Sequence, residues 1–578
     1  MPDNNNKSID GLTRVSTKKA TVKKPTKAPV AKKLTAKKPA AVSIAVNESS
    51  PAKMATPKPA TKPKKTVAPA VDEISAEIAN LEQSEPEMTA VEPAAKKAAN
   101  KHSLVSKIIC LVLLLAEAAA GGFFIYELIH INVLADWQNY AIIVVMALLF
   151  LFTARKLTKK KAKNATRIVC CVIAALLAIG YGIGGYYVST ISNFLEKITT
   201  VDNTETQEYS IVVYKDSGIK KISQLKGKTV GFQTSNIHLK LAESKLKESI
   251  KYEKKEYDDL ASIFIDMDNG SLNAISLASS YLEVLKEDAK DYYDRLKVIY
   301  KYEIEFEKEK KSAKKVDTQN EPFILYISGV DSRTGVKATA RSDVNMLAVI
   351  NPKKNKILLV SVPRDYYVQL HGTTGKKDKL THAGIYGIDM SKNTMADLFG
   401  GIEIAHTIKV SFKTVENLVD AIDGIDIYSD KAYRAWTDPN CYIKQGNIHL
   451  DGKCALAFSR ERMTYATGDR HRVENQQNVF SAILKKVTSI QYIVNYPKLL
   501  SAIEGTFQTS LSYEEVTGFA KMQMNTMKSW GIEEYSVNGS GGMQPTYSMG
   551  SQPLYVMIPD QSTVDEAIAK IKETLSTK

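Results

Sequence analysis

Four arginines fall within the short segment "FSRERMTYATGDRHRV", Phe458–Val473. They are Arg460, Arg462, Arg470 and Arg472. Guanidinium groups stay ionised and offer paired N–H donors that match the oxygens of phosphate or carboxylate groups. The segment could be a solvated helix face, a nucleic-acid patch or the lining of a pocket for a phosphorylated substrate. In an extended chain Arg460 and Arg462 would face the same side, which favours contact with a single ligand.

Further charged residues flank three apolar segments upstream of the arginines. The segments are "FILYISGV", "VNMLAVI" and "ILLVSV", and their composition predicts buried strands of an α/β sheet. The flanking residues are Asp331, Arg333, Arg341, Asp343, Arg364 and Asp365. Ligand sites in such sheets gather where loops leave the strand ends. These residues are therefore candidates for the same site as the arginines, although Asp331 could instead cap the next segment and pair with Arg333.

The positive charge of the chain lies mostly in its N-terminal segment. The 578 residues carry a formal net charge of +15, and residues 1–103 supply +9 of it, with 19 Lys and Arg against 10 Asp and Glu. Residues 1–100 contain no Phe, Tyr or Trp, so this segment cannot bury enough apolar surface to offset its conformational entropy. We expect a disordered tail that is either simply solvated or drawn to anionic lipid or nucleic acid.

Three apolar stretches between residues 104 and 190 predict transmembrane helices. The tail before them and the loop "RKLTKKKAKNATR" between the second and third are basic, whereas the loop between the first two has no Lys or Arg. The positive-inside rule places the basic segments in the cytoplasm. An odd number of crossings then places everything after the third helix outside the cell. The arginine cluster would therefore lie where DNA does not, and we expect no specific nucleic-acid binding.

Beyond the membrane segment, residues 205–305 alternate short strands and helices and predict a small α/β accessory domain. A charged linker is expected over residues 306–321, and the strands described above open a further domain at residue 322. Cys441 and Cys454 are the two cysteines outside the apolar stretches. They lack the ligand count of a structural zinc site, and an extracytoplasmic location would allow a disulfide between them, with two reduced thiols as the alternative.

From about Phe323 to Leu484 the chain resembles the LytR–CpsA–Psr family of bacterial cell-wall proteins. The resemblance is carried by an ordered series of motifs: "GVDSR", "RSDVNMLAVINP", "VSVPRDYYV", "KLTHA", "LVDAIDGIDI", "LDGKCALAFSRER" and "GDRHRVENQQ". Three preceding spans and an accessory domain are similar to the streptococcal-type capsule members of the family. The fold class expected is α/β, with three N-terminal transmembrane helices, the accessory domain and an α/β/α sandwich with a mixed central sheet over residues 322–578.

The resemblance implies a membrane-anchored phosphotransferase outside the cell. Such an enzyme moves a glycopolymer from a polyprenyl-diphosphate carrier to peptidoglycan, with Mg²⁺, or alternatively Mn²⁺, at the diphosphate. By motif, Asp331 and Asp343 match the metal-associated aspartates. The residues matched to diphosphate binding are Arg341, Arg364, Arg460, Arg462, Arg472, Gln476 and Lys379. The residues assigned to catalysis are Arg364, Asp365, Arg460 and Arg462, and Asp365 and Glu461 are the alternatives for the general base.

Two other functions remain open from the sequence alone. Water could replace the glycan acceptor, which would make the protein a polyprenyl-diphosphate hydrolase. A non-catalytic regulator of cell-wall genes, acting through the basic tail, is the other alternative. Arg470 and His471 occupy variable positions of their motif, and we expect them to have no role in the site. The identity of the polymer, which could be capsule or teichoic acid, is not encoded in these motifs.

Overall fold

The computed structural model describes residues 94–159, 163–200, 204–307, 315–330, 335–489, 496–526 and 528–576. Most of the expected disordered tail, residues 1–93, lies outside the described residues. Helix α1 begins at Ala94 rather than at residue 104. The Ala- and Lys-rich residues that precede the apolar stretch are strong helix formers, so they continue the helix of that stretch.

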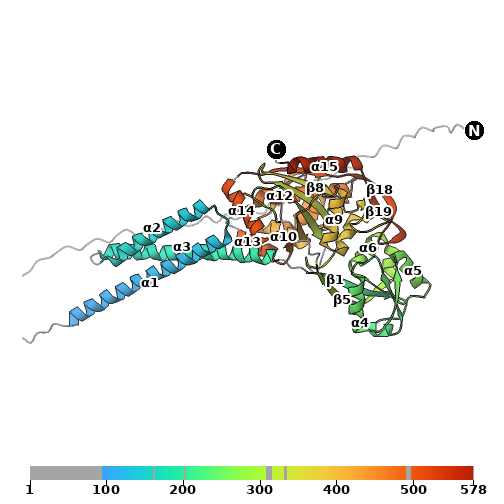
Figure 1. Ribbon diagram of the computed structural model, residues 1–578, viewed down its shortest axis with the longest axis horizontal. Coiled ribbons are helices and arrows are strands. Elements are labelled where there is room, and N and C mark those ends of the chain that lie inside the picture. The colour runs from blue at the N-terminus through green and yellow to red at the C-terminus, as the bar shows by residue number, and fades with distance from the viewer. Residues whose placement is uncertain are drawn as a thin grey trace, which may run out of the picture. The chain divides into compact units, whose positions relative to one another are not determined.

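Three N-terminal helices are long and apolar enough to cross a membrane. They are α1 (Ala94–Ile131), α2 (Asp136–Thr158) and α3 (Asn164–Thr199), as drawn in Figure 1. Small and apolar residues, among them Cys110, Leu157 and Ala174, form the buried contacts of this group of helices. The Thr153 hydroxyl donates a 2.9 Å hydrogen bond to the Glu117 carboxylate, so a polar group of α2 partners the carboxylate in α1.

Residues 204–307 form a five-stranded sheet with helices, which we call the accessory domain. Its strand order is β3-β2-β4-β1-β5, and β1 runs antiparallel to both of its neighbours. The strands are β1 (Thr204–Tyr214), β2 (Thr229–Gln233), β3 (Glu253–Tyr257), β4 (Ala274–Ala278) and β5 (Leu296–Glu307). The α-helices are α4 (Leu239–Ser249), α5 (Leu260–Asp268), α6 (Ser280–Asp288) and α7 (Lys290–Arg295).

The expected linker, residues 306–321, is partly ordered by packing. Strand β5 extends to Glu307, and residues 308–314 lie outside the described residues. Farther along, the Val316 amide donates to the Glu515 carboxylate at 2.9 Å, and the Thr318 hydroxyl donates to the Glu515 carbonyl oxygen at 2.7 Å. The second half of this segment is therefore fixed to helix α14 (Tyr513–Thr526).

A six-stranded mixed sheet forms the centre of the C-terminal part, residues 315–576, which we call the C-terminal domain. Its order is β16-β11-β6-β7-β8-β17, with β6–β11 and β8–β17 parallel and the other neighbours antiparallel. The strands are β6 (Phe323–Val330), β7 (Ser342–Asn351), β8 (Lys356–Val362), β11 (His406–Ser411), β16 (Phe507–Thr509) and β17 (Gly531–Ser536). In the β7–β8 turn Asn355 takes a positive φ of 49°, which asparagine tolerates.

Alternation along the central strands divides the apolar residues between two faces. Ile324 and Tyr326 of β6 pack with α9 (Ile388–Leu398) and α15 (Gln561–Leu575). Phe323, Leu325 and Ile327 face the opposite side, where Phe480 of α12 (Asp469–Val487) and Phe519 of α14 cover them. Helices therefore lie on both faces of the sheet. Strand β8 and helices α9, α12 and α15 are labelled in Figure 1. This α/β/α arrangement confirms the α/β fold class predicted from the sequence.

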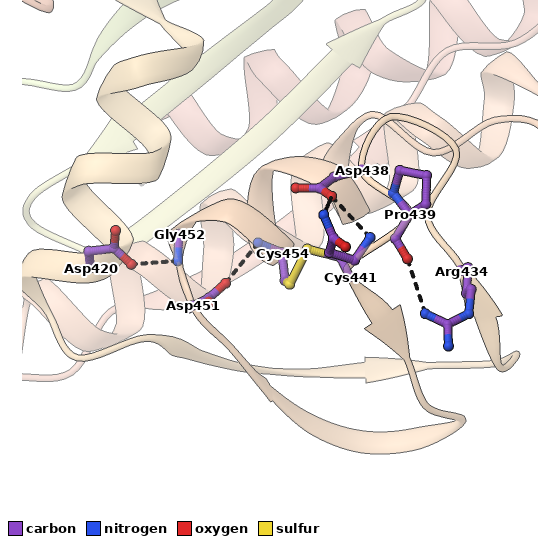
Figure 2. Close-up of a disulfide and its surroundings, with 9 residues drawn as sticks. Asp420, Arg434, Asp438, Pro439, Cys441, Asp451, Gly452 and Cys454 are labelled. Carbon is purple, nitrogen blue, oxygen red and sulfur yellow. Dashed lines mark hydrogen bonds between the residues drawn. A yellow bond between two sulfur atoms is a disulfide. The ribbon is translucent and has the colours of Figure 1, made fainter.

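A smaller cluster beside the sheet leads into the arginine-rich segment. It combines α10 (Phe412–Ala421) and α11 (Gly452–Ser459) with the short strands β12 (Ile425–Ser429), β13 (Tyr433–Arg434), β14 (Tyr442–Ile443) and β15 (Gly446–Leu450). Cys441 and Cys454 are joined by a disulfide, which connects the start of β14 to the first turn of α11 (Figure 2). The Asp451 carboxylate accepts the Cys454 N–H at 2.8 Å and caps the same turn.

The disulfide closes a short loop and should stabilise the segment that precedes the arginines. The two cysteines are 13 residues apart, and a loop of this length is associated with about 3 kcal/mol of stabilisation. Replacing both cysteines with serine should lower the thermal midpoint of the purified chain. Dithiothreitol should lower the midpoint of the wild-type chain to a similar extent and leave the double variant unchanged. Equal midpoints with and without the reductant in the wild type would contradict this prediction.

Candidate active site

Three strand termini that carry charged residues meet at one edge of the central sheet. Val330 at the end of β6 pairs with Ser342 at the start of β7. Asn345 of β7 pairs in turn with Val362, the last residue of β8. The antiparallel registers therefore bring the start of β7 and the end of β8 together, although Arg341 and Arg364 are far apart in sequence. The edge is the place at which the sequence predicted a site.

Arg364 follows β8 and contacts carboxylates on both sides. Its Nη1 atom lies 3.1 Å from Oδ1 of Asp343, and its Nε atom lies 3.7 Å from Oδ2 of Asp365. The Thr381 hydroxyl donates a second hydrogen bond to Asp343 Oδ1 at 3.2 Å. Burial raises the pKa of Asp343, but Arg364, Arg341 and Arg472 outweigh it and hold the pKa well below the usual range of a carboxyl group. Asp343 is therefore negatively charged at neutral pH, in contact with Arg364.

Lys379 reaches the same edge from the motif "KLTHA". It ends strand β10 (Asp378–Lys379), which is followed by the short helix α8 (Leu380–Ala383). Its Nζ atom lies 3.4 Å from Asp365 Oδ1. Burial raises the pKa of Asp365, and the stronger opposing effects of Arg364, Lys379 and Arg472 lower it overall. The Lys379 side chain is buried, and the Asp365 carboxylate offsets part of the cost of burying its charge.

A glycine after helix α8 allows the chain to pass close to Arg341. A Cβ atom at Gly384 would lie 2.5 Å from the carbonyl oxygen of Ala340 and 2.6 Å from the amide nitrogen of Ser342. No side chain fits at these distances from backbone atoms. The contact between α8 and the start of β7 thus depends on Gly384, and it sets the position from which Arg341 extends.

The arginines of the segment Phe458–Val473 do not share one environment. The guanidinium of Arg460 stacks over the Phe412 ring at 4.3 Å, whereas Arg462 lines the cavity described below. Between them, the fully buried Glu461 carboxylate accepts backbone N–H groups of Trp436, Met463 and Thr464 at 2.7, 2.8 and 3.1 Å. Glu461 therefore braces the loop, and of the two general-base alternatives Asp365 is the one that lines the cavity.

Helix α12 contributes Arg472 from its first turns. Arg472 is buried, and its charge lowers the pKa values of Asp343 and Asp365. His471 instead stacks on Tyr465 at a ring distance of 3.4 Å, and Arg470 is exposed. Gln476 is half-buried on the same helix, one residue before Gln477, whose amide is bonded to the backbone and side chain of β17.

These elements enclose a cavity of about 490 Å³. The residues that line it are Glu287, Asp288, Arg364, Asp365, Lys379, Arg462, Ala466, Thr467, Gly468 and Tyr555. Four of them, Arg364, Asp365, Lys379 and Arg462, were singled out in the sequence. Glu287 and Asp288 come from α6 of the accessory domain and were missed. They belong to the charged run "LKEDAKDYYDR", which cannot be distinguished from a solvated helix face without the tertiary structure.

One of the two aspartates expected to bind a metal, Asp343, lies within the described residues. Asp331 and Arg333 lie outside the described residues. Within the described ranges no group of three or more His, Cys, Asp or Glu side chains is arranged to hold a metal ion. Asp343 offers one ionised carboxylate, which lies beside the cavity residue Arg364. Mg²⁺ is commonly held by one or two carboxylates together with substrate phosphates, and this donor set fits that mode of binding.

The fold and the site define an α/β protein with a cavity lined by arginine, lysine and carboxylate side chains. The sequence profile described as the LytR_cpsA_psr family matches residues 292–572. A protein of Bacillus anthracis named polyisoprenyl-teichoic acid–peptidoglycan teichoic acid transferase TagU is 32% identical over 249 residues, which are 43% of this chain and 78% of that protein. The chain belongs to the LytR_cpsA_psr family and is a transferase.

A second relative and a solved structure are also similar to parts of this chain. A TagU of the same name from Enterococcus faecalis is 29% identical over 300 residues, which are 52% of this chain and 94% of that protein. Among solved structures, that of Bacillus subtilis TagV is 26% identical with a TM-score of 0.38, covering 44% of this chain and 98% of that chain. The family resemblance predicted from the motifs is confirmed by the family match and the sequence relatives.

The depressed pKa of Asp343 predicts a specific pH dependence of stability. A carboxyl group with a lowered pKa in the folded state contributes stability above its unfolded value of about 4 and loses it as the pH falls through the folded value. Asp343→Asn should therefore lower the thermal midpoint at pH ~7 by several degrees, since it leaves Arg364 with fewer partners. Below pH ~4 the wild-type and variant midpoints should begin to converge. A difference that stays constant down to pH ~2 would contradict the assignment.

Proposed function

We propose that this chain transfers a glycopolymer from a polyprenyl-diphosphate carrier to a hydroxyl group of peptidoglycan and leaves a phosphodiester bond. The observation that carries the proposal is the convergence of Arg341, Arg364, Lys379 and Arg462 on one edge of the sheet. A diphosphate ester needs such donors, because its negative charge must be neutralised in the ground state and in the transition state. The teichoic acid transferase names of the relatives support the same reaction class.

The transfer step balances without a redox partner. The acceptor hydroxyl oxygen forms a bond to the phosphorus that carries the glycan, and the bond between that phosphorus and the bridging oxygen of the diphosphate breaks. Polyprenyl monophosphate leaves with the electrons of that bond. We assign the hydroxyl proton to Asp365, the carboxylate in the cavity, and the charge on the leaving phosphate to Arg364 and Lys379. Phosphoryl transfer requires mainly positioning and charge stabilisation, which these residues supply.

Mg²⁺ is part of the proposal, with Mn²⁺ as the alternative. Asp343 would hold the ion together with Asp331, and the ion would add positive charge at the diphosphate. Stabilisation of the diphosphate charge does not depend on the ion alone. The buried guanidinium of Arg364 and the ammonium of Lys379 lie at the same edge, and nearby cations lower the pKa values of Asp343 and Asp365 beside them.

Loss of one cavity arginine should remove most of the activity. Arg462→Ala deletes a guanidinium that lines the cavity, and removal of one such charge-stabilising donor typically lowers the turnover rate by about 100-fold or more. Arg470→Ala is the matched control, since Arg470 lies in the same segment and is exposed. The measurement is product analysis with the purified chain, a synthetic polyprenyl-diphosphate oligosaccharide, peptidoglycan and Mg²⁺. Unimpaired transfer by Arg462→Ala would contradict the site.

The same assay distinguishes the transferase from a hydrolase. Glycan phosphate covalently attached to peptidoglycan supports transfer, whereas free glycan phosphate released at the same rate with and without peptidoglycan supports hydrolysis. Absence of any turnover, together with intact binding of the lipid diphosphate, would favour the regulator.

We further propose that helices α1, α2 and α3 anchor the protein in the cell membrane, with its N-terminus in the cytoplasm and the C-terminal domain outside. The basic residues around Arg155 and Arg167 favour this orientation. In this orientation the cytoplasmic tail lies beside the bilayer surface, where it would contact anionic lipids.

A reporter enzyme that is active only outside the cytoplasm should be active when fused to the C-terminus, and inactive when fused after α2. The reverse pattern would place the C-terminal domain in the cytoplasm, on the wrong side of the membrane for peptidoglycan.

A further inference from the structure

Two carboxylates of the accessory domain contact the cations of the candidate active site. Glu287 Oε2 accepts a hydrogen bond from Arg341 Nη1 at 2.5 Å and lies 3.5 Å from Arg364 Nη2. The next residue, Asp288, lies with Oδ2 at 2.8 Å from Lys379 Nζ. Both residues stand at the end of α6, and both line the cavity. Three of the cations matched to diphosphate binding are thus paired with carboxylates from another domain.

The position of α6 is fixed by a built interface between the two domains. Tyr281, in the first turn of α6, forms a 2.6 Å hydrogen bond with Tyr386 of the C-terminal domain, and both side chains are buried. At a second place, Lys409 Nζ lies 2.8 Å from Glu205 Oε1, again between buried side chains. Buried contacts between the two domains therefore hold the carboxylates at the end of α6 in place at the site.

Within these ion pairs the carboxylate of Glu287 is the accessible partner. The side chain of Glu287 is 35% exposed, whereas those of Arg341 and Arg364 are 10% and 7% exposed. Burial raises the pKa of Glu287, but Arg364 and Arg341 lower it more, so the group stays ionised at neutral pH. An incoming anion could displace this carboxylate by a side-chain rotation, while the arginines beneath it keep their places. Carboxylate and phosphate oxygens bind guanidinium donors in the same manner and therefore compete for them.

We propose that Glu287 and Asp288 are specificity-determining residues that hold Arg341, Arg364 and Lys379 until the diphosphate of the substrate displaces them. This inference rests on the proposed function, because it takes a diphosphate as the ligand of these cations. A diphosphate can replace several carboxylate contacts at once, whereas a monoanion can replace one. The accessory domain therefore makes the site selective for strongly charged, multidentate anions.

The opposite role would be that of a metal ligand. If Glu287 helped to bind a divalent ion with the diphosphate, neutralising it would weaken diphosphate binding. If Glu287 instead competes with the diphosphate for the arginines, neutralising it should strengthen diphosphate binding. The sign of the change in affinity therefore separates the two roles.

The test uses the full chain purified in detergent micelles, with Mg²⁺, and titrates it with inorganic diphosphate and with a short-chain polyprenyl diphosphate. Glu287→Gln should bind both ligands about two- to fivefold more tightly, which corresponds to the usual strength of a partly exposed ion pair. Asp288→Asn should change the affinity in the same direction. Glu283→Gln, at an exposed position of the same helix, is the matched control and should bind like the wild type.

Enzyme kinetics provides a second readout. Glu287→Gln should lower the KM for the lipid diphosphate and leave kcat within about twofold, because it changes binding rather than the chemical step. The ratio of diphosphate to monophosphate affinity should fall in Glu287→Gln. The neutral side chain competes less for the arginines, so a monophosphate can bind there as well. Glu287→Asp keeps the charge and should stay close to the wild type. Thermal midpoints identify any variant that is misfolded, and in that case Asp288→Asn provides the affinity test.

Unchanged or weaker diphosphate binding by a folded Glu287→Gln variant would overturn the inference, as would a loss of kcat at unchanged KM. These results would leave the proposed function intact as long as the wild type binds the lipid diphosphate and Arg462→Ala does not. If the wild type itself binds no diphosphate, the proposed function and this inference both fail.

Discussion

The need to balance charge at one buried edge of a sheet governs the arrangement of this protein. Arg364 and Lys379 are almost fully buried, and a buried cation without a partner would be far more unfavourable than any single packing contact can offset. Asp343 and Asp365 supply the partners from the adjoining strand ends, at distances of 3.1 to 3.7 Å. The strand register, the glycine after α8 and the position of α12 can all be understood as means of bringing these charges together.

The same balance explains why two domains meet at the site. The cations at the edge outnumber the carboxylates that the adjoining strands provide, and α6 of the accessory domain brings Glu287 and Asp288 to the remaining positions. Such charges can be held by carboxylates of the protein or by the phosphates of a ligand, and the donors are the same in both cases. The accessory domain therefore contributes residues to the candidate active site, and it is more than a spacer between the three apolar helices and the C-terminal domain.

The loop between α11 and α12 shows how neighbouring residues of one motif acquire different tasks. Arg462 lines the cavity and Arg460 stacks on Phe412, while Glu461 between them is withdrawn from solvent and binds three backbone amides. The disulfide joins the first turn of α11, the helix that precedes this loop, to the start of β14. This charged segment therefore forms one wall of the cavity.

The sequence by itself determined the α/β class, the three apolar helices and the family, because hydrophobic periodicity and ordered motifs are local properties of the chain. It also indicated the strand-end residues Arg341, Arg364 and Asp365, since charged residues that flank apolar strands collect at sheet edges. Only the tertiary structure distinguished Glu461 from Asp365, which lie in equally charged surroundings in the sequence. It alone brought Glu287 and Asp288 to the cations, because a contact between residues distant in sequence depends on how two domains pack and leaves no pattern in either segment.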